Sequence, residues 1–447
     1  MTTTRTHATT DCDVIVCGLG PVGQLLSLLL GDRGVRTLAI DRTDEPYRLP
    51  RAAAVDDELL RILQWVGLDR EVLADSQVQH GATFVTAGGR HVEVFRARSS
   101  GVGQPPLVSI NQPAMERAML AALADRATVE VRRGVTLEAF DRRPDAVETF
   151  LRPTGGGPCE SLSARWLVGC DGSSSDVRRL LEIDYPGRTA PQHWIVADAL
   201  VDRPVRKVPE PTLVGDPRRP AVSSPMSPGR HRWEWMLHPG EDAAPHLEPD
   251  AVRRGIAPWL DGEQVEIERA VTYAFHSRMA TSWRRGRVLL AGDAVHIMPP
   301  FTGQGFSSGG RDAANLAWKL AAVLAGAPES LLDSYEQERR PHVIAMQRLS
   351  ELLARMVQET RPGAVRRRDA VLGALDGRRA QQLLLAHSKP LPTYDAGAFA
   401  SRPSRVPAWR TVGAMFPQTD RLDDRLPAGW RPWRSTSAVR RRSRRRG

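Results

Sequence analysis

Glycines and acidic residues stand directly after apolar runs in this sequence, where they could bind phosphates or sugar hydroxyls. The string Gly18-Leu19-Gly20-Pro21-Val22-Gly23 follows the apolar run at 13–18, and Asp41 ends the next apolar run at 35–41. Residues 21–33, between the two runs, have the pattern of a helix. A G-x-G-x-x-G string in a β-α-β unit that ends in an acid predicts a dinucleotide site.

Each residue of this first motif has an expected role. Gly18 permits a tight turn, Gly20 lets the backbone approach a pyrophosphate, and Gly23 lets helix and strand pack closely. The helix that opens at Pro21 would direct free N–H groups at the phosphates. Asp41 would accept hydrogen bonds from the ribose hydroxyls. The alternative is a glycine-rich turn that binds no ligand.

A second site follows the apolar run at 287–292. Asp293 comes directly after this run, Pro300 lies in a rigid turn, and Gly303, Gly305 and Phe306 precede a helical pattern at 308–325. Asp293 could bond a hydroxyl group of a ligand. A helix that starts near Gly305 could direct its N-terminus at a part of the ligand where negative charge develops.

A third site, Asp171-Gly172, ends the apolar run at 166–171 and precedes Arg178 by a few residues. By itself, Asp-Gly is most often a turn. Arg42 and Arg51 follow the second apolar run and could neutralise a pyrophosphate. The alternative for both arginines is a solvated surface position.

The elements that must position these sites are spread along the chain. Buried, parallel-type strands are predicted at 13–18, 35–41, 166–170 and 287–291, and residues 80–110 and 190–280 have the alternation of antiparallel strands. Long helices are expected at 112–125, 308–325 and 331–357. One sheet built from such separated strands implies two interleaved domains rather than two consecutive ones.

Length and composition limit the remaining possibilities. The chain has 447 residues, 41% hydrophobic and 26% charged, as a soluble protein of two to three domains would. Residues 431–447 carry eight arginines and no acid, and without them the net charge falls from +10 to +2. The body therefore gives no argument for nucleic acid binding, and the tail is expected to be disordered. No secretory or membrane-spanning pattern is present, so a cytoplasmic location is expected. The four cysteines lack a metal or disulfide spacing, so no metal is expected.

Taken together and in this order, the three sites resemble those of the FAD-dependent aromatic hydroxylases, the group of para-hydroxybenzoate and phenol hydroxylases. The resemblance covers about residues 11–425 and is carried by GLGPVG, GCDGSSSDVRR and GRVLLAGDAVHIMPPFTGQGFSSGGRDAANLAWKLA. The strings YRLPRAAAVDDELLRILQWVGL and HRWEWMLHPGE look closest to the 3-(3-hydroxyphenyl)propionate and 3-hydroxycinnamate hydroxylases. That subgroup also includes tailoring enzymes of polyketide and other natural products.

The resemblance implies an α/β (α+β overall) fold. A Rossmann-like FAD-binding domain (1–75, 106–185 and 281–360) would be interleaved with a β-sheet-rich substrate domain (76–105 and 186–280), followed by C-terminal helices. It also implies a set of cofactor-binding residues. These are Gly18, Gly20, Pro21, Gly23, Asp41, Arg42, Arg51, Gln112, Asp171, Gly172, Asp293, Pro300, Gly303, Gly305 and Phe306.

The implied activity is hydroxylation of a phenolic ring through a flavin C4a-hydroperoxide, with NADH or NADPH as electron donor and O2 as co-substrate. The substrate would be similar to 3-(3-hydroxyphenyl)propionate. The alternatives are an FAD-dependent tailoring oxygenase or oxidoreductase of natural-product metabolism, and an impaired, truncated flavoprotein. A homodimer is also expected.

Two features depart from the family pattern. Relatives of the subgroup continue into a further C-terminal region, so residues 361–430 look truncated and the Arg-rich string 431–447 replaces what should follow. In addition, the usual Met-Asn after Gly-Gln-Gly is replaced by Phe306-Ser307. Flavin contacts through backbone N–H groups would survive this change, but contacts that depend on the usual side chains would not.

No residue is assigned as the catalytic base. A phenol reacts best as its phenolate, so a base or hydrogen-bond acceptor is expected near the ring hydroxyl. His231, His276 and His296 are candidates, with a structural role as the alternative for each. Trp233 and Trp235 share one face of a strand, where they could line the substrate pocket or pack in the core.

Overall fold

The N-terminal β-α-β unit forms as its apolar runs predict. In the computed structural model, β1 (Cys12–Cys17) and β2 (Thr37–Asp41) pair in parallel and flank α1 (Pro21–Gly31). The model describes residues 10–98, 100–377, 394, 396–398, 415, 418 and 421–425. The predicted disordered tail lies outside the described residues.

The first large sheet brings together strands that are far apart in the sequence. Its order is β17-β18-β11-β1-β2-β8, and β1 pairs in parallel with β11, which in turn pairs in parallel with β18. The predicted assembly of one sheet from separated apolar runs is therefore confirmed. Its further strands are β8 (Val129–Arg133), β9 (Val135–Arg142), β10 (Val147–Pro153), β11 (Glu160–Gly169), β17 (Arg284–Arg285) and β18 (Val288–Leu290).

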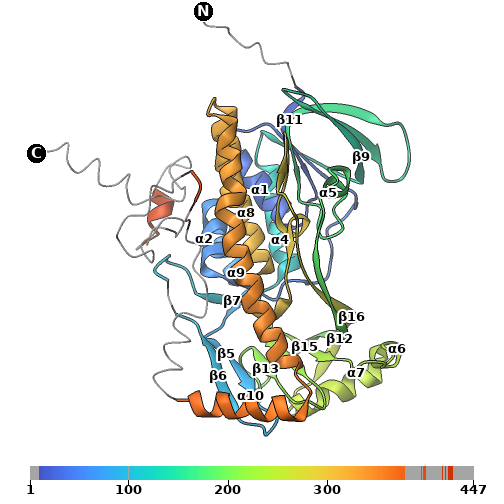
Figure 1. Ribbon diagram of the computed structural model, residues 1–447, viewed down its shortest axis with the longest axis vertical. Helices are drawn as coiled ribbons and strands as arrows, with labels where there is room; N and C mark the ends of the chain where they lie inside the picture. Colours follow the sequence, from blue (N-terminus) through green and yellow to red (C-terminus); the bar gives the residue numbers. More distant parts are fainter. Residues whose placement is uncertain are drawn as a thin grey trace, which may run out of the picture.

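The second large sheet is mainly antiparallel and occupies the lower half of Figure 1. Its order is β19-β16-β12-β15-β14-β13-β5-β6, in which only β5 and β13 pair in parallel. Its strands are β5 (Gly81–Val85), β6 (His91–Arg96), β12 (Gly187–Val201), β13 (Thr212–Val214), β14 (Ala221–Pro225), β15 (Arg230–Met236), β16 (Val265–Met279) and β19 (His296–Ile297). A small third sheet holds β3 (Ala54–Asp56), β4 (Ser76–Val78) and β7 (Leu107–Ile110).

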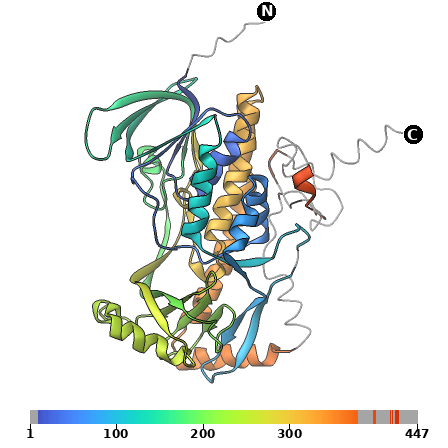
Figure 2. The ribbon, with the colours of Figure 1, turned by 180° about the vertical axis from the view of Figure 1, so that it is seen from behind.

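Helices cover both sheets. From behind, α1, α4 and α8 lie side by side next to the first sheet (Figure 2), and the long α9 runs from the first sheet to the second (Figure 1). The described helices are α2 (Asp57–Trp65), α3 (Asp69–Ala74), α4 (Gln112–Ala124), α5 (Asp176–Leu180), α6 (Ala244–Leu247), α7 (Pro249–Ile256), α8 (Gln304–Leu324), α9 (Asp333–Gln358) and α10 (Pro362–Leu375). None of the helices in the described ranges is long and apolar enough to cross a bilayer.

The start of α8 lies close to Gly305, where a helix N-terminus was expected, and four residues before the helical pattern at 308–325. The helix begins at Gln304, so Gly305, Gly309 and Gly310 lie inside α8. Glycine disfavours helices, but a Cβ at Gly309 would press against Val22 of α1, and one at Gly310 would overlap Leu59 of α2. Close packing between helices therefore outweighs intrinsic propensity here.

Candidate active site

The glycine loop between β1 and α1 is closed on one side and open on the other. Gly18 has φ of +100°, and a Cβ there would lie 2.5 Å from the carbonyl oxygen of Cys170. A Cβ at Gly23 would overlap the Gly18 carbonyl, whereas one at Gly20 would meet no atom within 4 Å. The loop thus needs its first and third glycines for packing, and its second glycine faces free space.

The start of α1 offers unpaired backbone donors. Gly20 is its N-cap, no side chain caps it, and its first turn holds no acidic residue. By contrast, the Asp56 side chain caps α2 and the Ser175 side chain caps α5. An uncapped N-terminus with a partial positive charge and open space in front fits a pyrophosphate.

Asp41 fastens the glycine loop to the end of β2. Its Oδ2 accepts a hydrogen bond from the Leu19 N–H at 2.7 Å, and its Oδ1 accepts from the N–H and hydroxyl of Thr43 at 2.8 and 2.7 Å. A carboxylate offers about four lone-pair sites. Capacity for a further hydroxyl therefore remains beside the loop.

The loops after β11 and β18 are tied together by Arg178. Its guanidinium donates to the carbonyls of Ala294 at 2.8 Å and Ser173 at 2.7 Å, and it lies 3.9 Å from the centre of the Tyr185 ring. The Tyr185 hydroxyl donates to the carbonyl of Asp293 at 2.9 Å. Sequence reasoning noted Arg178 but gave it no such role.

Asp171 organises the turn that precedes α5. Its carboxylate accepts from the Ser175 hydroxyl at 2.5 Å and from the Val177 N–H at 3.0 Å. Burial raises the pKa of Asp171, although these hydrogen bonds oppose the rise. Gly172 follows with φ of +81° and open space beside it.

Asp293 differs from the other two strand-end acids. Its side chain is exposed, and its carboxylate has no hydrogen-bond partner among the described residues. Pro300 is also exposed, seven residues further along the same segment. This acid is free to bind a hydroxyl of a ligand.

The start of α8 repeats the features of the start of α1. Gly303 is the N-cap with φ of +63°, no side chain caps the helix, and its first turn holds no acid. A Cβ at Gly305 would meet nothing within 4 Å. Phe306 is buried in the core, and the buried Ser307 hydroxyl accepts a hydrogen bond from the Asp56 N–H at 3.4 Å. The two unusual residues therefore point into the protein and leave the open backbone unobstructed.

Arg42, Arg51 and Gln112 lie on neighbouring loops. Arg42 is exposed and lies 3.7 Å from the Asp176 carboxylate, while the Arg51 guanidinium lies 4.5 Å from the centre of the Tyr47 ring. Gln112 Oε1 accepts hydrogen bonds from the backbone N–H groups of Arg51 and Ala52 at 2.8 and 2.5 Å. Gln112 thus shapes the loop that carries Arg51.

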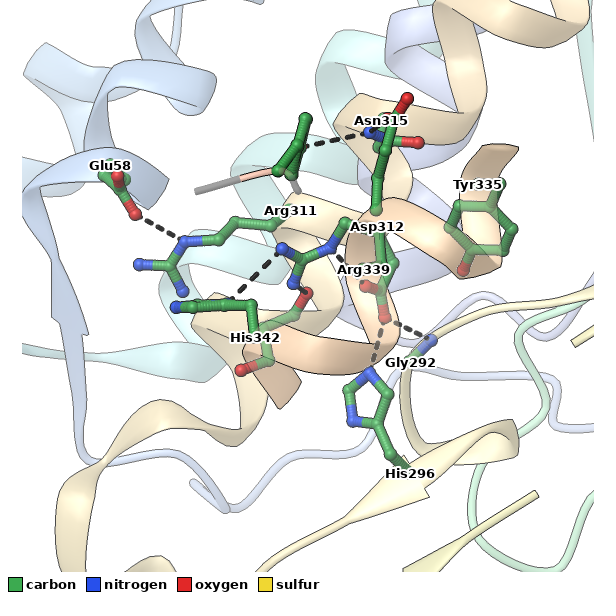
Figure 3. A network of polar contacts seen from close by, with 12 residues as sticks. Glu58, Gly292, His296, Arg311, Asp312, Asn315, Tyr335, Arg339 and His342 are labelled. Atoms are coloured by element: carbon green, nitrogen blue, oxygen red, sulfur yellow. Dashed lines mark hydrogen bonds and ion pairs between the residues drawn. The ribbon is translucent and has the colours of Figure 1, made fainter. Parts of the chain in front are cut away.

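A buried network of charged and polar residues holds the loop that follows β18 (Figure 3). Asp312 of α8 accepts hydrogen bonds from His296 Nε2 at 2.6 Å, Arg339 Nε at 2.9 Å and the Gly292 N–H at 3.3 Å. Burial alone would raise the pKa of Asp312, but His296 and Arg339 lower it. His296 is therefore a structural histidine that anchors the loop after β18.

The residue before Asp312 on α8 makes further ion pairs. Arg311 contacts the carboxylates of Asp56 and of Glu58, the latter at 2.5 Å, and so joins α8 to the start of α2. Sequence reasoning missed this network. The signal was present, because the adjacent charged residues Arg311 and Asp312 stand in the middle of a run of serines, glycines and alanines.

The other histidine and tryptophan candidates also have structural contacts. The buried His231 Nε2 lies 2.7 Å from the Ser223 hydroxyl, and burial lowers the pKa of His231 to about 3. His276 Nδ1 lies 2.9 Å from the Thr189 hydroxyl. Trp233 and Trp235 are both buried in the core beneath α7, which decides in favour of core packing.

The face of β15 opposite the two tryptophans contacts two loops of the candidate site, the loop of Arg51 and the loop of Pro300. On this face, Arg232 bonds the carbonyls of Pro50 at 2.7 Å and Arg51 at 3.0 Å. Towards the other end of the face, Trp194 and Phe275 pack against Phe301, with ring centres 5.6 and 5.3 Å apart. Phe301 directly follows Pro300, so this sheet face lies against the loops that carry the sequence-predicted residues.

Comparisons with known proteins agree with this geometry. The family described as FAD binding domain matches residues 11–350. The 3-(3-hydroxy-phenyl)propionate/3-hydroxycinnamic acid hydroxylase of Escherichia coli O8 (strain IAI1) is 38% identical over 409 residues, which are 91% of this chain and 73% of the relative. The enzyme of the same name from Mycolicibacterium gilvum (strain PYR-GCK) is 38% identical over 420 residues, 93% of this chain and 72% of the relative.

Solved structures place the fold in the same group. The p-nitrophenol 4-monooxygenase of Pseudomonas putida DLL-E4 matches with a TM-score of 0.75 and 25% identity, over 85% of this chain and 98% of that one. The OxyS anhydrotetracycline hydroxylase of Streptomyces rimosus matches with a TM-score of 0.73 and 28% identity, over 91% and 80%. With the matching family and relatives, these findings show that the chain belongs to the FAD-dependent aromatic hydroxylases, the monooxygenases built on this FAD-binding domain.

Proposed function

We propose that FAD binds along the loops after β1, β2, β11 and β18, between the open starts of α1 and α8. The observation that carries this proposal is the pairing of two uncapped, glycine-led helix N-termini, each with free space in front of it. α1 would receive the pyrophosphate and α8 the electron-rich edge of the flavin. The proposed contact residues are Gly18, Gly20, Pro21, Gly23, Asp41, Arg42, Arg51, Gln112, Asp171, Gly172, Asp293, Pro300, Gly303, Gly305 and Phe306.

The residues of this set would have different roles in binding FAD. Asp41 and Asp293 would bond the ribose and the ribityl hydroxyls, and Asp293 has its whole carboxylate available. Gln112 would act by holding the loop of Arg51. Phe306 would contribute its backbone N–H, because its side chain is buried in the core.

When bound, FAD supplies the two electrons and the activation of O2 that ring hydroxylation needs. The chain's own residues orient the two partners and exclude water. Trp194, Phe275 and Phe301 form an aromatic group at one end of the second sheet's inner face. Such a group would pack against an aromatic ring held over the flavin loop.

We propose a phenolic substrate similar to 3-(3-hydroxyphenyl)propionate, with NADH or NADPH as electron donor. The identity of 38% to hydroxylases of that name over most of this chain supports this substrate class. A cytoplasmic homodimer and the division into an FAD-binding and a substrate domain at the residues given above belong to the same proposal.

The test is the purified protein with FAD. We expect a flavin absorbance spectrum, NADH or NADPH oxidation that rises when 3-(3-hydroxyphenyl)propionate is added, and a product heavier by one oxygen atom. A panel with 4-nitrophenol and a polycyclic phenol separates a simple phenol hydroxylase from a tailoring enzyme. A protein that cannot be reconstituted with FAD, or that oxidises the nicotinamide without hydroxylating any phenol, contradicts the proposal.

A further inference from the structure

Glu234 is an acid without a hydrogen-bond partner among the described residues. It lies on β15, on the face of the second sheet that also carries Arg232 and Met236. Its side chain is half-buried. Its charged neighbours on the same face pair with one another. Asp198 binds Arg232 at 2.6 Å and Arg269 at 2.7 Å. Glu234 is therefore a half-buried carboxylate on this face that remains available to a ligand.

The strand register places Glu234 between the two candidate loops. It lies opposite Val196 of β12 and opposite Val222 of β14. Two residues before it on β15, Arg232 bonds the loop of Arg51, and two residues after it, Met236 joins the aromatic group at Phe301. A strand residue advances about 3.3 Å, so Glu234 lies about 7 Å along β15 from Arg232 on one side and about 7 Å from Met236 on the other.

The charges around Glu234 suit proton transfer. Burial raises the pKa of Glu234, Asp198 adds to the rise, and Arg232 and Arg269 oppose it. Tyr273 of β16 lies on the same face, and burial and Asp293 raise its pKa. A carboxylate whose pKa lies above its usual range is a better base for a phenol than an ordinary surface glutamate.

We propose that Glu234 accepts the hydrogen bond of the substrate's ring hydroxyl and takes its proton as the ring is attacked. This inference rests on the proposed function. The phenolic O–H bond breaks, the proton moves to the carboxylate, and the electron pair left on oxygen activates the ring carbon that receives the oxygen atom from O2. The ring then becomes aromatic again as the proton of that carbon passes to solvent water, and Glu234 returns its own proton to the original ring oxygen. The second atom of O2 leaves as water, with the two electrons that the nicotinamide would supply through bound FAD.

The main test compares Glu234→Gln, Glu234→Asp and the control Glu266→Gln, which changes an exposed glutamate of the same sheet. We expect Glu234→Gln to lower hydroxylation turnover about 100-fold while FAD content stays as in the wild type. The acidic limb of the pH profile of kcat should vanish in Glu234→Gln and persist, at a lower rate, in Glu234→Asp. Glu266→Gln should match the wild type.

Several outcomes would overturn the inference. One is a Glu234→Gln variant that keeps both its turnover and its acidic limb. If that variant does not fold, the wild type decides, because it must bind 4-nitrophenol more tightly than the methyl ether 4-nitroanisole and must lose turnover in acid. Equal binding of the two probes refutes the role of Glu234, and so does a turnover that does not fall at acidic pH. A wild type with FAD but no phenol-dependent turnover contradicts the proposed function as well.

Discussion

Replacing Gly20 by aspartate tests the assignment of the α1 N-terminus most directly. Gly20 has φ of −70° and ψ of −178°, an extended conformation that any residue adopts at an N-cap, and its Cβ position is empty. Aspartate is a favoured N-cap, so we expect the FAD-free protein to be as stable as the wild type or more stable by up to about 1 kcal/mol. A change at the heart of a binding motif would thus leave folding intact.

The same change should strongly weaken FAD binding. The new carboxylate would stand where the pyrophosphate approaches the helix. Two like charges about 4 Å apart at an effective dielectric of about 20 repel by about 4 kcal/mol. Solvent at this open site screens part of that repulsion, so we expect a loss of about 3 kcal/mol, or roughly 100-fold in Kd.

The assay compares Gly20→Asp with Gly20→Asn, which has the same size and capping ability but no charge. FAD Kd is measured by titration of the apoprotein, and stability by thermal unfolding without FAD. The ratio of the two Kd values isolates the charge effect and should shrink as salt is raised. Equal Kd values would refute the placement of the phosphates, and a large drop in apoprotein Tm would refute the claim of free space.

Three further predictions concern the surroundings of this loop. Gly23→Ala should destabilise the fold by about 1–3 kcal/mol in urea unfolding, because its Cβ overlaps the Gly18 carbonyl; unchanged stability would contradict the packing described. Asp293→Asn should leave apoprotein stability unchanged but weaken FAD binding by about 1–2 kcal/mol in titration, since its carboxylate has no partner within the described ranges. Asp312→Asn should cost about 3–5 kcal/mol in urea unfolding, because it leaves the buried guanidinium of Arg339 without its carboxylate. The folded pKa of Asp312 is lowered, so its contribution is present above the unfolded pKa and is lost as the pH falls through the folded value. The Asn variant should therefore lose less stability in acid than the wild type, and parallel pH curves would count against this account.

The positions of the candidate site residues could be predicted from the sequence, because each depends only on the residues that directly precede it. A glycine or an acid that directly follows an apolar run must lie at the carboxyl end of a strand, and parallel strands bring those ends to one edge. Gly18, Asp41, Asp171 and Asp293 were found in this way. The glycines inside α8 could not be explained from the sequence, because propensity alone cannot anticipate that Val22 and Leu59 need glycines opposite them.

The supporting charges could not be predicted for a different reason. Asp312 holds His296 and Arg339, and Arg311 holds Asp56, a residue more than 250 positions earlier. Nothing in the local sequence specifies these partners. A buried charge requires compensation, so the pattern predicts that partners exist, but only the packing of α8 against α2 and α9 identifies them.

The strand β15 shows what the sequence leaves open and which contacts of the structure decide it. The string RHRWEWM alternates, so the sequence establishes that Trp233 and Trp235 share one face and Glu234 the other. It does not say which face is covered. Val252 and Ile256 of α7 pack in the same core cluster as both tryptophans. The loops that carry Arg51 and Phe301 then contact the opposite face. A shift of β15 by one residue would exchange the two faces of the strand. The tryptophans were candidates for the substrate pocket because they share one face of a strand in the β-rich segment, yet the side chain that we propose to meet a substrate is the glutamate between them.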